Sequence, residues 1–213
     1  MDFGGVVVGL GNPGNQYAGT RHNCGFAFVE SLLDHARREG GQVQSQNGGK
    51  FSCELWRLRY DGLPGDWLDA MPQTFMNLSG ESVVQLVNWY KPERDQLIIC
   101  FDDVDLPEGK LRFRPSGSAG THNGMRSIVG LLGYENFPRL RVGVGQRRPG
   151  YELADWVLGH YLPGEEQQTA DAAYALAADA IIEYITNGIE SAMCKYNTKK
   201  TKKPPEPAEG ADA

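Results

Sequence analysis

The 213-residue sequence has few cysteines and no long apolar run. None of its apolar stretches approaches the roughly 20 residues that a membrane-spanning helix needs, so we expect a soluble protein with no membrane partner. Its first five residues lack a basic region followed by an apolar segment, and we therefore expect no secretory signal. The cysteines show no CxxC spacing and lie mostly in apolar patterns, which argues against structural zinc and favours reduced thiols in a cytoplasmic protein. They are Cys24, Cys53, Cys100 and Cys194.

Positive charge is also scarce, with 21 Lys and Arg against 27 Asp and Glu and a net charge of −6. Taken alone, this balance argues against a nucleic-acid partner. However, residues 107–148 hold eight cations and two acids, a local charge of +6, so the rest of the chain carries −12. A basic face on an acidic body suits a protein that grips phosphates at one place. The alternative is ordinary solvated charge on two strands and a helix.

Apolar patterns predict strands that alternate with helices. Short apolar runs predict buried strands at 5–10 and 97–101, and alternation predicts strands at 51–60, 67–70, 110–114 and 140–144. Helical spacing predicts helices at 22–38, 77–90, 124–132 and 165–186. Interleaved strands and helices indicate a single α/β domain with a mostly parallel or mixed sheet, over residues 1–197. Residues 198–213 are rich in Lys, Pro and Ala with almost nothing to bury, so we expect a disordered tail.

The segment GLGNPGNQYAGTRHNCG at 9–25 combines a glycine turn after an apolar run with a histidine. Its opening matches G-x-G-x-x-G, the fingerprint of dinucleotide binding. Pro13 lacks the N–H that a pyrophosphate would need, and the acidic residue expected about 20 positions on would be Glu30 or Asp34, inside the first predicted helix. We therefore reject that interpretation. Asn12 follows the predicted central strand, where α/β folds build ligand crevices.

His22 and Asp102 are the candidate chemical groups. A histidine near a helix N-terminus has its cationic form disfavoured, so His22 is expected to be a neutral base. Asp102 ends an apolar strand and is followed by Asp103 and Asp105, a cluster that could hold Mg²⁺. A phosphate-cradling loop of the GxxxxGK[ST] type is missing, which makes this metal interpretation the weaker one. We expect no metal and no cofactor.

Asn77 and Asn123 each precede a predicted helix. Asparagine is favoured there as an N-cap. Its side chain also offers a donor and an acceptor together, which suits the binding of a peptide backbone of any sequence. Both explanations stay open.

Taken together, these segments resemble the bacterial-type peptidyl-tRNA hydrolase family. Its hallmarks GLGNPG, TRHN, TFMN, a strand-terminal Asp and an HNG turn occur here in the family's order, within residues 6–190. The resemblance implies a catalytic α/β domain with a mixed central sheet flanked by helices. It also implies hydrolysis of the ester bond between a peptide and tRNA, with recycling of tRNA from stalled translation.

The resemblance also implies roles for individual residues. His22, oriented by Asp102, would activate water, while Asn12 and Asn77 would hold the peptide and polarise the carbonyl. The remaining roles are substrate binding by Tyr17, Met76 and Asn123, and contact with tRNA phosphates by Arg112, Arg114 and Arg141. The partners would be peptidyl-tRNA and water, and we expect a monomer.

The sequence departs from the family pattern at two places. Thr121 stands in a run before HNG where the family has glycine, and Arg112 and Arg114 stand where it often has lysines. Arginine forks grip phosphate bidentately, so the function should survive. The alternative function is a hydrolase-like RNA-binding scaffold that has lost catalysis, as in intron splicing. Intact His22, Asp102 and Asn12 favour the enzyme.

Overall fold

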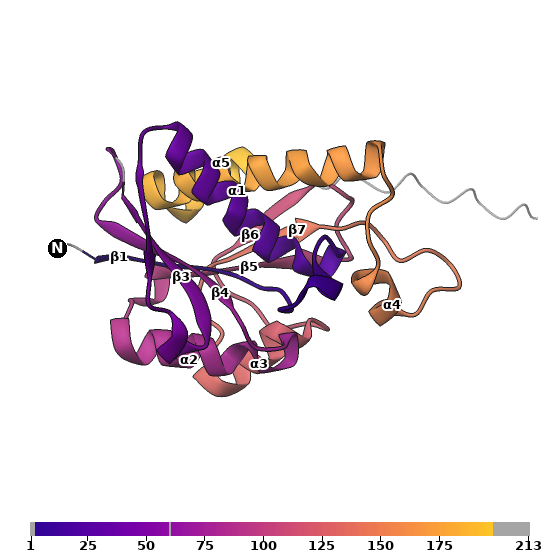
Figure 1. The fold of residues 1–213 in the computed structure, drawn as a ribbon, viewed down its shortest axis with the longest axis horizontal. Coiled ribbons are helices and arrows are strands. Elements are labelled where there is room, and N and C mark those ends of the chain that lie inside the picture. Colours follow the sequence, from indigo (N-terminus) through magenta and orange to yellow (C-terminus); the bar gives the residue numbers. More distant parts are fainter. Residues whose placement is uncertain (1–2, 60, 198–213) are drawn as a thin grey trace, which may run out of the picture.

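The computed structural model describes residues 3–59 and 61–197, and a mixed β-sheet runs through the centre of this part of the chain (Figure 1). The sheet has seven strands within the described residues, in the order β2-β3-β4-β1-β5-β7-β6. Neighbours among β4, β1, β5 and β7 run parallel, whereas the pairs β2–β3, β3–β4 and β6–β7 are antiparallel. The strands are β1 (Phe3–Gly9), β2 (Gln42–Gln46), β3 (Cys53–Arg59), β4 (Asp66–Pro72), β5 (Leu97–Asp103), β6 (Leu111–Arg114) and β7 (Arg139–Gly143).

Helices cover both faces of the sheet. Figure 1 shows α1 (Cys24–Arg38) and α5 (Glu165–Tyr196) on one face and α2 (Ser79–Tyr90) and α3 (Asn123–Leu132) on the other. Each face has its own apolar core, because alternate residues of a strand point to opposite sides. Val7, Phe28 and Phe113 lie in the core under α1 and α5, and Val8 and Leu86 lie in the core under α2 and α3. The prediction of one α/β domain with a mixed sheet is confirmed.

Two glycines let α1 pack closely against the end of β1. A Cβ on Gly9 would lie 2.1 Å from the carbonyl oxygen of Gly25, and one on Gly25 would lie 2.2 Å from the nitrogen of Leu10. Both contacts are far too short for a real side chain. The glycines of the first motif therefore bring the start of α1 against the carboxyl end of β1, where Asn12 and His22 follow.

Several boundaries differ from the prediction. The first helix begins at Cys24, because Arg21–Asn23 forms a separate 3₁₀ turn. α5 continues to Tyr196, but its backbone leaves the helical conformation at Gly188 (φ 83°). The Glu183 side chain accepts a hydrogen bond from Asn187 before this break and hydrogen bonds from Ser191 and Lys195 after it. The first segment of α5 thus ends close to the predicted end at residue 186.

One strand and one α-helix were not predicted from the sequence. β2 has the sequence QVQSQ, which carries almost no apolar signal, and it is an edge strand held to β3 by backbone pairing. α4 (Leu153–Leu158) has six residues, too few for a helical period to stand out. The predicted disordered segment 198–213 lies outside the described residues.

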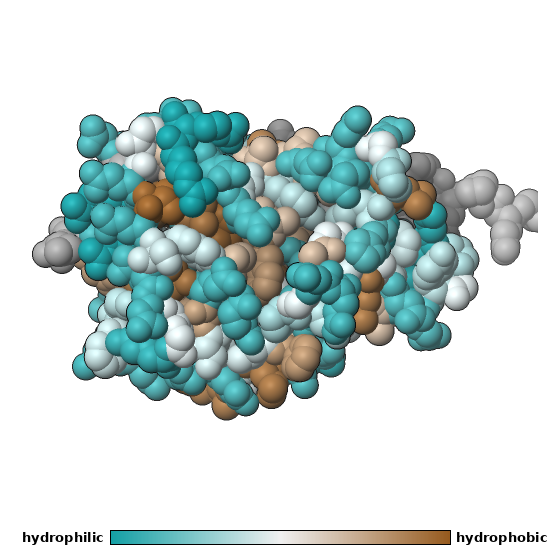
Figure 2. Space-filling view, in the orientation of Figure 1, coloured by the Kyte–Doolittle hydropathy of each residue, from teal (hydrophilic) through white to brown (hydrophobic). Residues whose placement is uncertain are grey.

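The surface is mostly hydrophilic on the face that Figure 2 shows, and apolar side chains gather over α2 and α3 at its lower edge. Leu131 of α3 is an exposed apolar side chain. Among residues 3–59 and 61–197, no helix combines the length and apolar character that crossing a membrane requires.

Candidate active site

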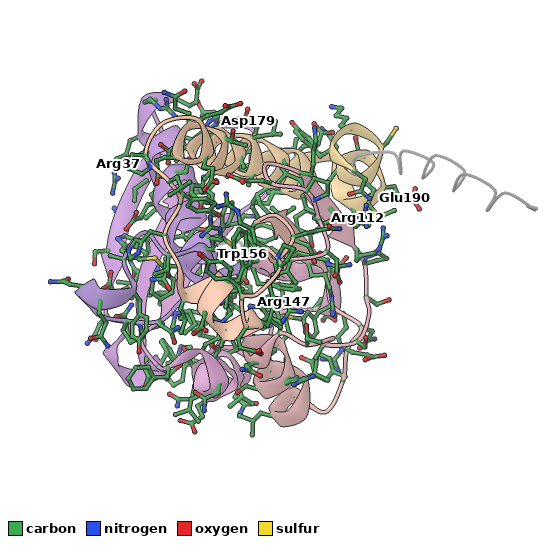
Figure 3. The ribbon with its side chains drawn as sticks, turned by 90° about the vertical axis from the view of Figure 1, so that its right-hand side faces the viewer. Arg37, Arg112, Arg147, Trp156, Asp179 and Glu190 are labelled. Carbon is green, nitrogen blue, oxygen red and sulfur yellow. The ribbon has the colours of Figure 1, made fainter. Side chains whose placement is uncertain are left out.

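A cavity of about 920 Å³ lies at the carboxyl ends of β1 and β5. Figure 3 looks onto this end of the molecule, with α4 and its Trp156 in front. Adjacent parallel strands of α/β sheets commonly build ligand crevices at this edge. The lining includes most of the predicted site residues, namely Asn12, His22, Met76, Asn77, Asp102, Arg114, Asn123 and Arg141.

Two histidines contact one oxygen of Asp102. The Oδ1 atom lies 2.8 Å from Nδ1 of His22 and 3.0 Å from Nε2 of His122. A carboxylate only accepts hydrogen bonds, so Nδ1 of His22 carries a proton and donates it. In the neutral imidazole, Nε2 of His22 is then the unprotonated nitrogen. His22 lines the cavity, and its side chain is 11% exposed.

The Asp102 carboxylate is ionised in this arrangement. Burial alone raises the pKa of this group, but the charges and hydrogen bonds of His122 and His22 lower it more. The net effect holds the pKa of Asp102 well below its usual range. A fixed negative charge at this point favours the imidazolium that would form when His22 takes a proton.

His122 was not among the predicted site residues, although it stands in the HNG motif. It is the N-cap of α3, and its Nδ1 accepts a hydrogen bond from the backbone N–H of Met125 at 3.2 Å. Because Nδ1 accepts, the proton of a neutral His122 is on Nε2, which donates to Asp102. The HNG motif stands at the start of a predicted helix, and this position was the one sequence feature that could have pointed to His122. Its contact with Asp102 becomes visible only in the fold.

His22, Asp102 and His122 also form the one group of potential metal ligands found among the described residues. A metal bound through Nε2 of His122 would require the proton on Nδ1, where it would face the N–H of Met125. The donor set is therefore arranged for hydrogen bonding. The predicted alternative of Mg²⁺ on Asp102, Asp103 and Asp105 does not fit either. Asp103 instead pairs with Arg141 at 2.5 Å and accepts the N–H of Asp105.

The amide of Asn12 has a defined orientation. Its Oδ1 accepts the backbone N–H of Met76 at 2.8 Å, so Nδ2 is the side-chain donor left for the cavity. The backbone of Asn12 is held as well, since its N–H and C=O both pair with the side chain of Asn23. Asn23 was another residue that sequence reasoning missed. Asn12 thus presents a fixed N–H donor on the wall that also carries His22.

Capping does not explain Asn77 or Asn123. The side chain of Asn77 makes no cap hydrogen bond, and α2 begins two residues later at Ser79. The cap of α3 is His122, and Asn123 is already the first helical residue. Both asparagines are exposed and line the cavity. Their amides are available to a ligand.

Tyr17 and Met76 differ in their distance from the cavity. Met76 is buried and lines it. Tyr17 does not line it, but contacts the exposed ring of Phe75 edge-on, and Phe75 does line it. Thr121 is exposed at the cavity, and the positive φ angles of its loop fall on Gly117 and Gly120. Threonine therefore fits this position without backbone strain.

Four arginines face one another across the β6–β7 pair. Arg112 lies opposite Arg141, and Arg114 lies opposite Arg139, so all four share one face of the sheet. Partial burial and the charges of Arg114 and Arg141 lower the pKa of Arg112. Like charges directly opposite each other on neighbouring strands are destabilising unless other groups compensate them.

The four arginines are not equivalent. Arg139 is buried and donates to the backbone carbonyls of Gly117 and Glu135, so it holds the loop that forms one wall of the cavity. Arg139 is therefore not part of the basic surface that the sequence predicted. Arg114 and Arg141 line the cavity. Arg112 lies outside its lining, and Figure 3 shows it toward the edge of the molecule, away from Trp156.

The carboxyl edge of this α/β sheet thus holds a histidine on a buried carboxylate, an oriented amide and a row of arginines, a set of groups suited to hydrolysis by a general base. The comparisons with known proteins specify the class further. A family model described as peptidyl-tRNA hydrolase matches residues 6–204. This chain belongs to the peptidyl-tRNA hydrolase family.

Relatives and solved structures agree with this assignment. A peptidyl-tRNA hydrolase of Desulfovibrio desulfuricans is 44% identical over 214 aligned residues, covering 100% of this chain and 93% of the relative. One of Chloroflexus aurantiacus is 48% identical over 196 residues, covering 90% and 98%. The crystal structure of peptidyl-tRNA hydrolase from Acinetobacter baumannii superposes with a TM-score of 0.79 at 35% identity, covering 91% of this chain and 95% of that one.

Proposed function

We propose that this protein hydrolyses the ester bond between peptide and tRNA with His22 as general base. The observation that carries the mechanism is the contact between Nδ1 of His22 and Asp102, which leaves Nε2 as the base. Nε2 takes a proton from water, and the hydroxide oxygen attacks the ester carbonyl carbon. The tetrahedral intermediate then expels the ribose oxygen, which takes the proton back from His22. The products are free peptide and tRNA, and no cofactor is needed.

Asn12 supports this proposal as the group that stabilises the oxyanion. Negative charge develops on the carbonyl oxygen in the tetrahedral intermediate, and a preorganised N–H donor lowers its energy. Nδ2 of Asn12 is such a donor, because its partner oxygen is held by Met76. Asn77 and Asn123 would bind the peptide and the acceptor end of the tRNA, together with Met76 and, through Phe75, Tyr17.

The tRNA phosphates would bind to the arginine face of β6 and β7. Arg114 and Arg141 are placed at the cavity, and Arg112 continues the same face beyond it. We expect Arg141 to contribute less than Arg114, since Asp103 already neutralises it. The alternative of an inactive RNA-binding scaffold finds no support, because the matched relatives are named as hydrolases.

The protein would act as a monomer in the cytoplasm. Its described cysteines are all free thiols, and Cys24, Cys53 and Cys100 are buried in the cores. Such thiols suit a reducing compartment. Size-exclusion chromatography with light scattering would test the oligomeric state directly.

The mechanism is tested by His22→Ala on an N-acetyl-aminoacyl-tRNA substrate. A general base contributes roughly 10²–10⁴-fold to the rate, so we expect kcat to fall by that factor. Thermal stability and affinity for deacylated tRNA should stay close to wild type. His35→Ala, on the α1 surface beside Asp179, is the matched control and should keep full activity. A His22→Ala variant with most of its kcat would refute the mechanism.

A further inference from the structure

Arg21, the residue before the proposed base, is almost completely buried. Its side chain is 5% exposed, and its guanidinium lies 4.1 Å from the ring centre of Trp156 and 4.7 Å from that of Tyr161. It also donates to the carbonyl of His160 at 2.7 Å and to Glu166 at 3.0 Å. A buried arginine with this many partners holds separate segments of the chain together.

The segment that follows α4 is joined to the turn that carries His22. The backbone N–H of Arg21 donates to the carbonyl of Gly159 at 3.0 Å, and Thr20 forms an isolated antiparallel bridge with His160. Nε2 of His160 lies 3.0 Å from the carbonyl of Ala18. The backbone and side chain of Arg21 therefore attach the end of α4 to residues 18–21.

α4 forms one wall of the active-site cavity through Leu153, Ala154, Val157 and Leu158. A helix of six residues is too short to be stable alone, and α4 has no side-chain cap. Its anchor is Trp156, which stacks on Arg21 and donates from Nε1 to the carbonyl of Gly145 at 3.1 Å. The position of this wall thus depends on Arg21.

Glu166, at the start of α5, completes the cluster. One of its oxygens accepts from Arg21 and from the N–H of Leu162, and the other accepts from Arg148 at 2.6 Å. Arg148 also approaches Trp156, at 5.7 Å from the ring centre. A planar guanidinium stacks flat on a ring while its edge donates to a carbonyl and a carboxylate, a geometry that the compact ammonium of lysine does not reproduce.

We propose that Arg21 is a positioning residue for the hydrolysis, an inference that rests on the proposed function. It joins the His22 turn to α4, so a substrate held against the α4 wall presents its ester carbonyl at a fixed distance from Nε2 of His22. Arg21 itself lies beneath Trp156 and does not line the cavity. It therefore acts through α4 and the turn and takes no part in proton transfer.

The test compares Arg21→Met and Arg21→Lys with Arg37→Met. Arg37 is exposed on α1, pairs with Asp34, and lies far from Trp156 in Figure 3. We would measure kcat and KM on N-acetyl-aminoacyl-tRNA, the pH profile of kcat/KM, the melting temperature and hydrogen exchange of residues 153–162. Displacement of a reacting group by about 1 Å can cost 10²-fold in rate, so we expect Arg21→Met to lose about 10- to 100-fold in kcat/KM.

The remaining expectations separate positioning from general support of the fold. Exchange should accelerate in residues 153–162 and little elsewhere, and the midpoint of the pH profile should not move, because the His22–Asp102 contact is intact. Arg21→Lys should lose nearly as much activity as Arg21→Met, and it carries the test if Arg21→Met does not fold. In a further variant, Arg21→Ala, millimolar guanidinium should restore part of the activity. Arg37→Met should match wild type in every measurement.

Two results would overturn the proposal. In the first, α4 exchanges faster in the Arg21 variants while kcat/KM stays at the wild-type value. In the second, activity falls together with a shifted pH profile or a general loss of protection, which would indicate collapse of the site. A wild-type protein inactive on the substrate would instead refute the proposed function.

Discussion

At the scale of single residues, His122 is the group whose role the structure defines most directly. It donates to Asp102 and caps α3 through its other ring nitrogen. We predict that His122→Asn lowers kcat by about tenfold, because the pKa and orientation of Asp102 depend on both histidines. Asparagine is a good N-cap, so the melting temperature should hardly change.

The matched variant His122→Ala loses the cap as well as the contact with Asp102. It should show the same fall in kcat and an additional loss of about 1 kcal/mol in the free energy of unfolding. Steady-state kinetics and urea denaturation of both variants separate the two roles. Full activity of His122→Asn would show that one histidine suffices to hold Asp102.

The candidate site could be predicted from the sequence only in part. His22, Asp102 and Asn12 stand in local motifs at the ends of elements, and the fold brings them together at one cavity. Arg21 and Asn23 stand in the TRHN motif, but their roles depend on partners 11 to 145 positions away along the chain, and Arg139 holds a loop residue 22 positions away. From its charge alone, Arg139 was predicted to lie on a basic surface. Its hydrogen bonds show that it supports the wall of the active-site cavity.

At the scale of elements, β4 carries an unusual buried acid. Asp69 is fully buried, and both carboxyl oxygens lack a hydrogen-bond partner among the described residues. Alternation along the strand puts it on the same face as Trp67 and Met71, in the core under α1 and α5. Burial raises the pKa of Asp69 to about 8.

This raised pKa gives a prediction for stability against pH. The unfolded chain has an ordinary Asp with a pKa of about 3.9, so between about pH 4 and pH 8 the folded state binds more protons than the unfolded state. The contribution of Asp69 to the free energy of unfolding therefore falls as pH rises, by at most about 1.4 kcal/mol per unit, and levels off above pH 8. Asp69→Asn should remove this slope in urea titrations, and the exposed control Asp34→Asn should keep it.

The main elements of the fold follow from periodicity, and the exceptions have physical reasons. Buried strands such as β1 and β5 are continuous apolar runs, and α1, α2 and α3 repeat apolar residues at helical spacing, so both types were predicted. β2 and α4 were not predicted. Backbone pairing with β3 stabilises β2, and the contacts of Trp156 stabilise α4. Elements held by partners distant in sequence leave no periodic signal.

At the scale of the whole molecule, charge is separated along the chain and in space. The net charge is −6, yet residues 107–148 carry +6, and β6 and β7 gather their arginines on one face beside the cavity. Asp103 neutralises Arg141, and backbone carbonyls engage Arg139. The remaining cations form a limited basic surface on an acidic body, which suits attraction of tRNA at one place without general binding of nucleic acid.

Arg114 offers the clearest test of this surface, because no acidic group is paired with it in the described part of the chain and its side chain reaches the cavity. Each phosphate contact adds about one unit to the slope of log affinity against log salt. We predict that Arg114→Gln weakens the binding of deacylated tRNA and lowers the steepness of that slope by about one. The affinities would be measured at salt concentrations from about 50 to about 200 mM. Hydrolysis of a small ester without tRNA should stay near the wild-type rate, and Arg38→Gln on exposed α1 should change neither quantity. Equal losses on tRNA and small-ester substrates would show that Arg114 supports the active site, and an unchanged slope would place the phosphates elsewhere on the protein.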